Sequence, residues 1–182
     1  MKLFLAPHND DETLFGAFTL LREKPLVCIV YDSQVQRKRG LPITVDERRD
    51  ESERACTILG CSVGFLGVPD DALLTPDTIA LGVGVRYPKV SELWAPAFEP
   101  GGHDQHNVVA LAAARLGVKT TYYTTYTREH GRTKGREVPI ENAKWIALKL
   151  TALACYRSQH TLDPRAGCWP WFIGDQREYY KS

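Results

Sequence analysis

Residues 3–31, which read LFLAPHNDDETLFGAFTLLREKPLVCIVY, decide the fold. The stretch begins and ends with unbroken apolar runs, at 3–6 and 26–31. Such runs are typical of strands that are covered on both faces, as in a parallel sheet. Between them, apolar residues recur at helical spacing over 14–21, until Pro25 ends the segment. The sequence therefore predicts a strand, a helix and a second, parallel strand.

The same alternation continues along the chain. We expect further helices at 45–59, 78–85, 105–116 and 140–158, and further strands at 63–66, 92–97 and 120–124. This order predicts an α/β protein, a three-layer α/β/α sandwich around a mainly parallel sheet. The length of 182 residues suits a single domain that spans residues 1–182. We expect the least ordered segments at 32–40, at 126–139 and after residue 160.

Composition and charge exclude several classes of protein. The chain is 43% hydrophobic and 25% charged, as globular proteins are, and its net charge of +1 argues against a nucleic-acid-binding protein. The five cysteines form no CxxC pair, so neither a disulfide framework nor a cysteine-based zinc site is indicated. No apolar stretch approaches the roughly 18 residues that span a bilayer. We expect a cytoplasmic protein without a membrane span, and a homo-oligomer is left open.

Two polar turns follow predicted strands. The first carries His8, Asn9, Asp10, Asp11 and Glu12, and the second carries His103, Asp104, Gln105 and His106. Because ligands bind at the carboxyl ends of parallel strands, we expect both turns to contribute to one site. Zinc in a hydrolytic site commonly takes three ligands from His, Asp and Glu and keeps a fourth position for water. His8, Asp11 and one histidine of the second turn could supply these ligands, which would leave Asp10 as a base.

Each turn also has an explanation that involves no metal. Acidic residues at the start of a helix are favoured by the helix dipole and by capping, so residues 9–12 could form only a helix N-terminus. Two histidines three positions apart often occur by chance on a surface or in a core. Both turns are expected at one edge of the sheet, and this coincidence favours the metal site.

Five segments, taken in order, resemble the motifs of one protein family. PHNDDE at 7–12 resembles the PHPDDE-type signature, and HDQH at 103–106 resembles the HPDH-type signature, of the LmbE-like or PIG-L-like zinc-dependent N-acetylglucosaminyl deacetylases. Further agreement comes from Arg48, Glu51, Ala55 and Leu59-Gly60, from GVPDD at 67–71, and from Lys149, Ala152, Tyr156 and Ser158-Gln159. The resemblance covers residues 3–160 and implies a Rossmann-like fold.

Carried over residue by residue, the resemblance implies one zinc ion per chain, although another divalent metal could take its place. His8, Asp11 and His106 would bind the metal. Asp10 would be the general base, and His103 would act opposite it. The implied reaction is hydrolysis that removes an N-acetyl or other N-acyl group, with water activated by the metal.

The resemblance also concerns the substrate, a small molecule that contains N-acetylglucosamine or a related amide. Arg48 and one of Asp70 or Asp71 would contact it. The basic residues 37–39 follow a predicted strand and could border the site, so the substrate could be anionic. A solvated loop is the alternative explanation of these charges.

Three departures from the motifs leave other functions open. Asn9 stands where the family has proline, Asp104 and Gln105 replace a Pro-Asp pair, and Tyr156 stands where histidine is frequent. One alternative is a non-catalytic protein that binds a metal or another ligand. A second is a metal-dependent phosphoesterase, whose two-metal sites hold ions about 3.5–4 Å apart.

Overall fold

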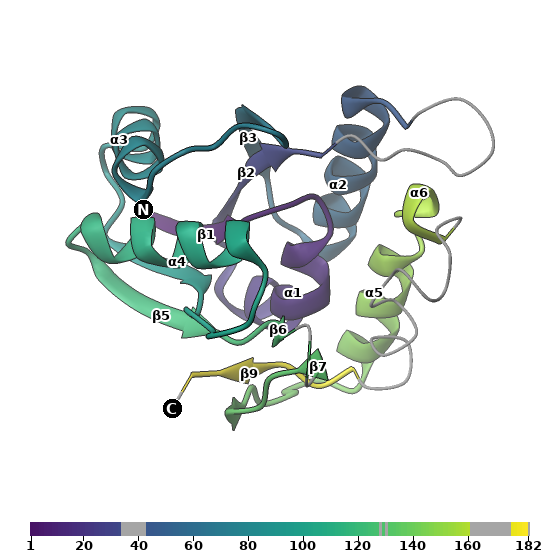
Figure 1. Ribbon diagram of the computed structural model, residues 1–182. Coiled ribbons are helices and arrows are strands. Elements are labelled where there is room, and N and C mark those ends of the chain that lie inside the picture. The colour runs from purple at the N-terminus through teal and green to yellow at the C-terminus, as the bar shows by residue number, and fades with distance from the viewer. Residues whose placement is uncertain (34–42, 128, 130, 161–175, 182) are drawn as a thin grey trace.

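A seven-stranded sheet forms the centre of the protein (Figure 1). The computed structural model describes residues 1–33, 43–127, 129, 131–160 and 176–181. The strands of the sheet are β1 (Lys2–Ala6), β2 (Leu26–Asp32), β3 (Val63–Pro69), β4 (Glu92–Pro96), β5 (Lys119–Tyr123), β8 (Arg136–Glu137) and β9 (Tyr179–Tyr180), in the order β3-β2-β1-β4-β5-β9-β8. The first five run parallel, and β9 is antiparallel to both of its neighbours. A separate ribbon pairs β6 (Tyr126–Thr127) with β7 (Gly131–Arg132).

Helices cover both faces of this sheet. The described helices are α1 (Asp11–Glu23), α2 (Val45–Leu59), α3 (Pro76–Arg86), α4 (Asp104–Arg115), α5 (Lys144–Leu153) and the short α6 (Arg157–His160). Residues of α1, α2 and α5 share one apolar cluster with the sheet, and residues of α3 and α4 share another. The structure therefore confirms the expected α/β/α sandwich with a mainly parallel sheet.

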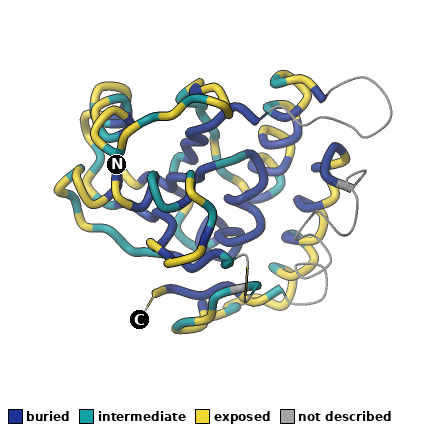
Figure 2. Tube along the Cα trace, in the orientation of Figure 1, coloured by how far each residue is buried: buried dark blue, intermediate teal, exposed yellow. Residues whose placement is uncertain are grey.

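Strand β1 is covered on both faces, which explains why its sequence is apolar without interruption. Phe4 belongs to the cluster beneath α1, α2 and α5, whereas Leu3 and Leu5 belong to the cluster beneath α3 and α4. All three side chains are fully buried. Figure 2 shows in dark blue the buried backbone that gathers in the middle of the molecule. Gly16 lets α1 lie close to this strand, because a Cβ there would collide with the Phe4 ring.

Helix α2 begins and ends where its sequence predicts. Thr44 and Glu47 form a capping box at its start, and Gly60 takes a left-handed conformation with φ 72° at its end. This helix carries Arg48 and Glu51 on its buried face. The sequence signals at its two ends therefore determine the bounds of α2, the helix that supports the first polar turn.

The expected single helix at 140–158 is wrong, because the structure divides it into α5 and α6. The backbone N–H groups of Cys155 and Tyr156 bond to carbonyls only three residues earlier, which tightens and ends the helix. The turn allows Tyr156 to be fully buried against α1. The segment 126–139, expected to be among the least ordered, contains the short strands β6, β7 and β8 in its described part.

Candidate functional site

The two polar turns meet where the strand order of the sheet reverses. From β1 the sheet continues through β2 and β3 on one side and through β4 and β5 on the other. His8 comes shortly after β1, and residues 103–106 follow β4, which pairs in parallel with β1. Open α/β sheets bind ligands beyond the carboxyl ends of their strands at such a switch point. The topology therefore brings the two turns to the expected place.

Three side-chain atoms converge between the turns. Asp11 Oδ2 lies 3.1 Å from His8 Nδ1 and 3.1 Å from His106 Nε2, and the two nitrogens are 3.2 Å apart. Around a tetrahedral zinc ion with bonds of about 2.0–2.2 Å, neighbouring ligand atoms lie about 3.3–3.6 Å apart, slightly further than these atoms do without a metal. Two imidazole nitrogens and one carboxylate oxygen at this spacing fit a single divalent metal ion.

His103 also belongs to this neighbourhood. One ring nitrogen from each of His8, His103 and His106 lies within 4.8 Å of the others, so the three histidines could hold a metal ion. However, His103 caps α4, because its Nδ1 accepts a hydrogen bond from the Gln105 N–H at 3.3 Å. In a neutral imidazole the other nitrogen, Nε2, then carries the hydrogen and acts as a donor rather than a ligand. Asp11 Oδ2, at 3.1 Å from both His8 Nδ1 and His106 Nε2, can instead supply the third ligand.

The electrostatics of the cluster favour the ionised form of Asp11. Burial opposes the ionised form of Asp11, but the charges and hydrogen bonds of His106 and His8 lower the pKa of its carboxyl group below the usual range. Burial likewise opposes a charge on His8, and the hydrogen bond and charge of Asp11 outweigh it and raise the His8 pKa. An anionic carboxylate therefore remains at the centre of the cluster.

Asp10 lies next to these ligand atoms in an unusual backbone conformation. Its φ of 111° is rare for a residue other than glycine, and strain of this kind costs about 1–3 kcal/mol and gathers at functional sites. Its side chain makes no capping hydrogen bond to α1, which weighs against the explanation that the acidic run only begins a helix. Burial raises the pKa of Asp10 to about 7, although Arg48 acts in the opposite direction.

Arg48 holds the first turn from inside the protein, where it is only 2% exposed. Its Nη2 donates to the carbonyl oxygen of Asn9 and lies 3.4 Å from Asp10 Oδ2. Its Nη1 donates to Ser158 Oγ at 3.1 Å and to Glu51 Oε2 at 3.4 Å. The guanidinium thus joins the turn to α2 and α6, while its expected contact with substrate stays a prediction.

Glu12 and Tyr156 form a second support, besides Arg48, for the first polar turn. The Tyr156 hydroxyl donates to Glu12 Oε1, and the backbone N–H of Asp10 donates to Glu12 Oε2 at 3.0 Å. Burial raises the pKa of Glu12 to about 8, although the Tyr156 hydrogen bond lowers it. The tyrosine that departs from the family motif therefore supports the turn that carries Asp10.

Asn9, the first departure from the family motif, anchors α2. Its fully buried side-chain amide donates to Ser52 Oγ at 3.0 Å and to the Arg48 carbonyl at 3.3 Å. A proline could make neither bond. No local pattern indicates this contact, because Asn9 and Ser52 are 43 positions apart.

Of the two aspartates expected to contact substrate, Asp70 is connected through Gln105 to His8, one of the three candidate metal ligands. Both residues are exposed. Gln105 Nε2 donates to the Asp70 carbonyl at 2.7 Å and to its Oδ1 at 3.2 Å. Tyr31, whose pKa is raised by burial and by the charge of Asp70, stacks on His8 with ring centroids 5.8 Å apart. These contacts favour Asp70 over Asp71 as the residue nearer the site.

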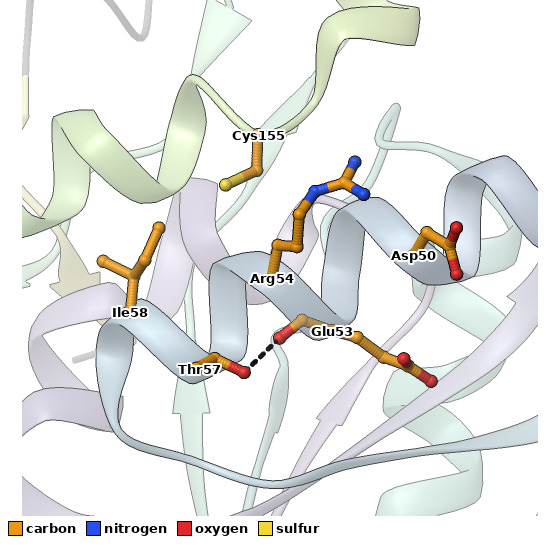
Figure 3. A pocket seen from close by; sticks show the side chains of 6 residues that line it. All are labelled: Asp50, Glu53, Arg54, Thr57, Ile58 and Cys155. Carbon is orange, nitrogen blue, oxygen red and sulfur yellow. Dashed lines mark hydrogen bonds between the residues drawn. The ribbon is translucent and has the colours of Figure 1, made fainter.

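A separate pocket of about 500 Å³ lies beside α2. It is lined by Asp50, Glu53, Arg54, Thr57, Ile58 and Cys155 (Figure 3). None of these belongs to the two polar turns. Helix α2 therefore presents one face to this pocket and its other, buried face to Asp10.

Comparisons with known proteins identify the fold. No family model matches the sequence, and no curated protein matches it. The structure is similar to that of the conserved protein TT1542 from Thermus thermophilus, with 24% identity and a TM-score of 0.65 over 100% of this chain and 93% of that one. It is also similar to the N,N'-diacetylchitobiose deacetylase of Pyrococcus horikoshii, solved with an inhibitor, with 16% identity and a TM-score of 0.71 over 99% of this chain and 82% of that one.

A third similar structure has a different activity. The 4-carboxy-2-hydroxymuconate hydratase GalB of Pseudomonas putida shares 16% identity and a TM-score of 0.68 over 96% of this chain and 84% of that one. The chain therefore has the LmbE-like fold, and at these identities the likeness concerns the fold alone. None of the helices in the described part of the chain has the length and apolar character that crossing a bilayer requires.

Proposed function

We propose that this protein is a metal-dependent hydrolase that removes an N-acetyl or related N-acyl group from a small molecule. The observation that carries the proposal is the convergence of His8 Nδ1, Asp11 Oδ2 and His106 Nε2 within 3.1–3.2 Å of one another. The shared fold of the chitobiose deacetylase supports it. Zinc in hydrolytic sites uses such a set of two imidazoles and one carboxylate, and another divalent metal could take its place.

His8, Asp11 and His106 would hold the metal. When bound, zinc would act as a Lewis acid that lowers the pKa of water toward about 7 and polarises the amide carbonyl. Asp10 would accept the proton of the attacking water through its carboxylate. Arg48 contacts Oδ2 of that carboxylate, which leaves Oδ1 to receive the proton.

His103 would act on the opposite side of the substrate. Because Nδ1 accepts the capping hydrogen bond of α4, the Nε2–H of a neutral His103 is a donor. It would stabilise the oxygen that gains negative charge when water adds to the carbonyl carbon. A protonated His103 would instead give its proton to the departing amine. The products are acetate, or another acid, and a free amine.

The substrate we propose is a compound with N-acetylglucosamine or a related amide, contacted by Asp70 or Asp71 at the rim of the site. Both aspartates are exposed, as residues that bind sugar hydroxyls must be. Arg48 would reach such a substrate only if it left its buried contacts. The basic residues 37–39 lie outside the described residues, so an anionic substrate stays a prediction.

Acetate release tests the proposal. Purified protein loaded with zinc would be incubated with N-acetylglucosamine, N,N'-diacetylchitobiose and a phosphorylated N-acetyl sugar, with a chelator-treated sample as control. We expect release that depends on metal and that falls about 100- to 10,000-fold in Asp10→Asn, the range that a general base contributes, with the metal retained. Retained zinc with no release from a broad set of N-acyl compounds would instead support a non-catalytic binding protein.

Hydration is the second candidate reaction, because the hydratase GalB has this fold. A carboxylate that takes a proton from water could serve addition to a double bond as well as hydrolysis. Loss of ultraviolet absorbance from an unsaturated carboxylic acid, without acetate release from amides, would favour it. A two-metal phosphoesterase has less support, since within the described residues one cluster of His, Cys, Asp or Glu has the spacing of a metal site.

A further inference from the structure

We propose that Gln105 sets the tautomer of His8 and so prepares it as a metal ligand. The inference rests on the metal centre proposed above and concerns a residue that is not itself a ligand. Gln105 stands where the family motif has aspartate, and no role for it followed from the sequence. Its side chain links a ligand of the first turn to the loop after β3.

Two short hydrogen bonds define this link. Gln105 Oε1 lies 2.6 Å from His8 Nε2. On its other side, Gln105 Nε2 donates to the Asp70 carbonyl oxygen at 2.7 Å and to Asp70 Oδ1 at 3.2 Å. The amide therefore bridges His8 and Asp70, which are far apart in the sequence.

The direction of each hydrogen bond follows from its partners. A backbone carbonyl can only accept, so the Gln105 group that faces Asp70 must be the NH₂. The amide oxygen then faces His8 and can only accept, so His8 Nε2 must carry the hydrogen. A neutral imidazole carries one hydrogen, which leaves a lone pair on His8 Nδ1. That atom is the one that lies 3.1 Å from Asp11 Oδ2 and 3.2 Å from His106 Nε2.

Without Gln105, the neighbouring carboxylate favours the wrong tautomer. Asp11 Oδ2 is placed to accept a hydrogen from His8 Nδ1, and a hydrogen there would block the lone pair that a metal needs. The hydrogen bond from His8 Nε2 to Gln105 Oε1 competes with this arrangement, because it keeps the hydrogen on Nε2 rather than on Nδ1. Outer partners of metal-binding histidines typically contribute 10- to 100-fold in metal affinity.

Three variants separate the parts of this inference. Gln105→Ala removes both bonds, whereas Gln105→Glu keeps an acceptor for the His8 N–H and loses the donor to Asp70. Leu111→Ala is the matched control, since it shortens an exposed side chain of the same helix. Zinc affinity would be measured by competition with a chromogenic chelator. The His8 tautomer would be read from ¹⁵N chemical shifts of labelled histidine in metal-free protein, at a pH where His8 is neutral.

We expect zinc affinity to fall about 10- to 100-fold in Gln105→Ala, to stay near the wild-type value in Leu111→Ala, and to be largely rescued in Gln105→Glu. The ¹⁵N spectrum of the wild type should show His8 with hydrogen on Nε2, and Gln105→Ala should shift it toward Nδ1. If Gln105→Ala fails to fold, the ¹⁵N spectra of the wild type and of Gln105→Glu test the inference instead, because His8 must carry its hydrogen on Nε2 in both proteins.

Two contrary results have different meanings. A wild-type chain that binds zinc and releases acetate, with unchanged zinc affinity in a folded Gln105→Ala, would overturn the role of Gln105 and leave the proposed function intact. A wild-type chain that binds no divalent metal would contradict both. A His8 hydrogen found on Nδ1 in the wild type would overturn the inference by itself.

Discussion

Arg48 Nη2 reaches Asp10 Oδ2 at 3.4 Å from a position 38 residues further along the chain. The contact connects α2 to the carboxylate that we propose as the base, in a place where Arg48 is 2% exposed. If Arg48 acts through Asp10, its loss should change the rate of the chemical step. If it contacts the substrate, its loss should weaken substrate binding.

We therefore expect Arg48→Lys to lower kcat while KM changes little, because lysine keeps a charge but cannot hold Asn9, Asp10 and Ser158 together. The decrease can approach the roughly 100- to 10,000-fold that a general base contributes. Steady-state kinetics of acetate release would measure it, with Arg54→Lys on the exposed face of α2 as the control. A raised KM with an unchanged kcat would instead favour the substrate contact.

Metal binding should stabilise the fold, since its three ligands come from two turns that are held together only in the folded state. At a free zinc concentration 100 times its Kd, the free energy of unfolding should rise by about 2.7 kcal/mol. Urea denaturation with zinc and with excess chelator would measure the difference. Asp11→Ala should lose most of this stabilisation, and an equal gain in that variant would show that zinc binds elsewhere.

Lys149 of α5 and Glu178 form a buried ion pair that joins α5 to the segment directly before β9. Lys149 Nζ lies 2.7 Å from Glu178 Oε1, and the side chains are 1% and 0% exposed. Lys149→Met would leave the carboxylate without its charged partner, so we expect a loss of about 3–5 kcal/mol in the free energy of unfolding. Denaturation curves would measure it, with Lys144→Met on the exposed side of α5 as the control. A loss below 1 kcal/mol would contradict this role.

The sequence predicts most of the fold because its main signals are local. The apolar runs of β1 and β2, the capping box at Thr44 and the left-handed Gly60 each act within a few residues. The break between α5 and α6 and the two-residue strand β9 escape such patterns. They depend on distant partners, the contact of Tyr156 with Glu12 and the pairing of β9 with β5.

The same limit applies to the site. The residues of the two turns could be chosen because each turn is short and both were expected at one edge of the sheet. The roles of Asn9 and Gln105 could not be predicted in this way, because their partners Ser52 and Asp70 lie 43 and 35 positions away in the sequence. Arg48 was expected at the substrate, and only the three-dimensional structure places its guanidinium against Asp10.

The central claim is that Asp11, rather than His103, completes the metal site with His8 and His106. Metal content per chain, measured by inductively coupled plasma mass spectrometry after loading with zinc and removal of the excess, tests it most directly. We expect one zinc ion in the wild type and in His103→Ala, and almost none in Asp11→Ala. Full zinc content in Asp11→Ala together with its loss in His103→Ala would contradict the claim and assign the site to the three histidines.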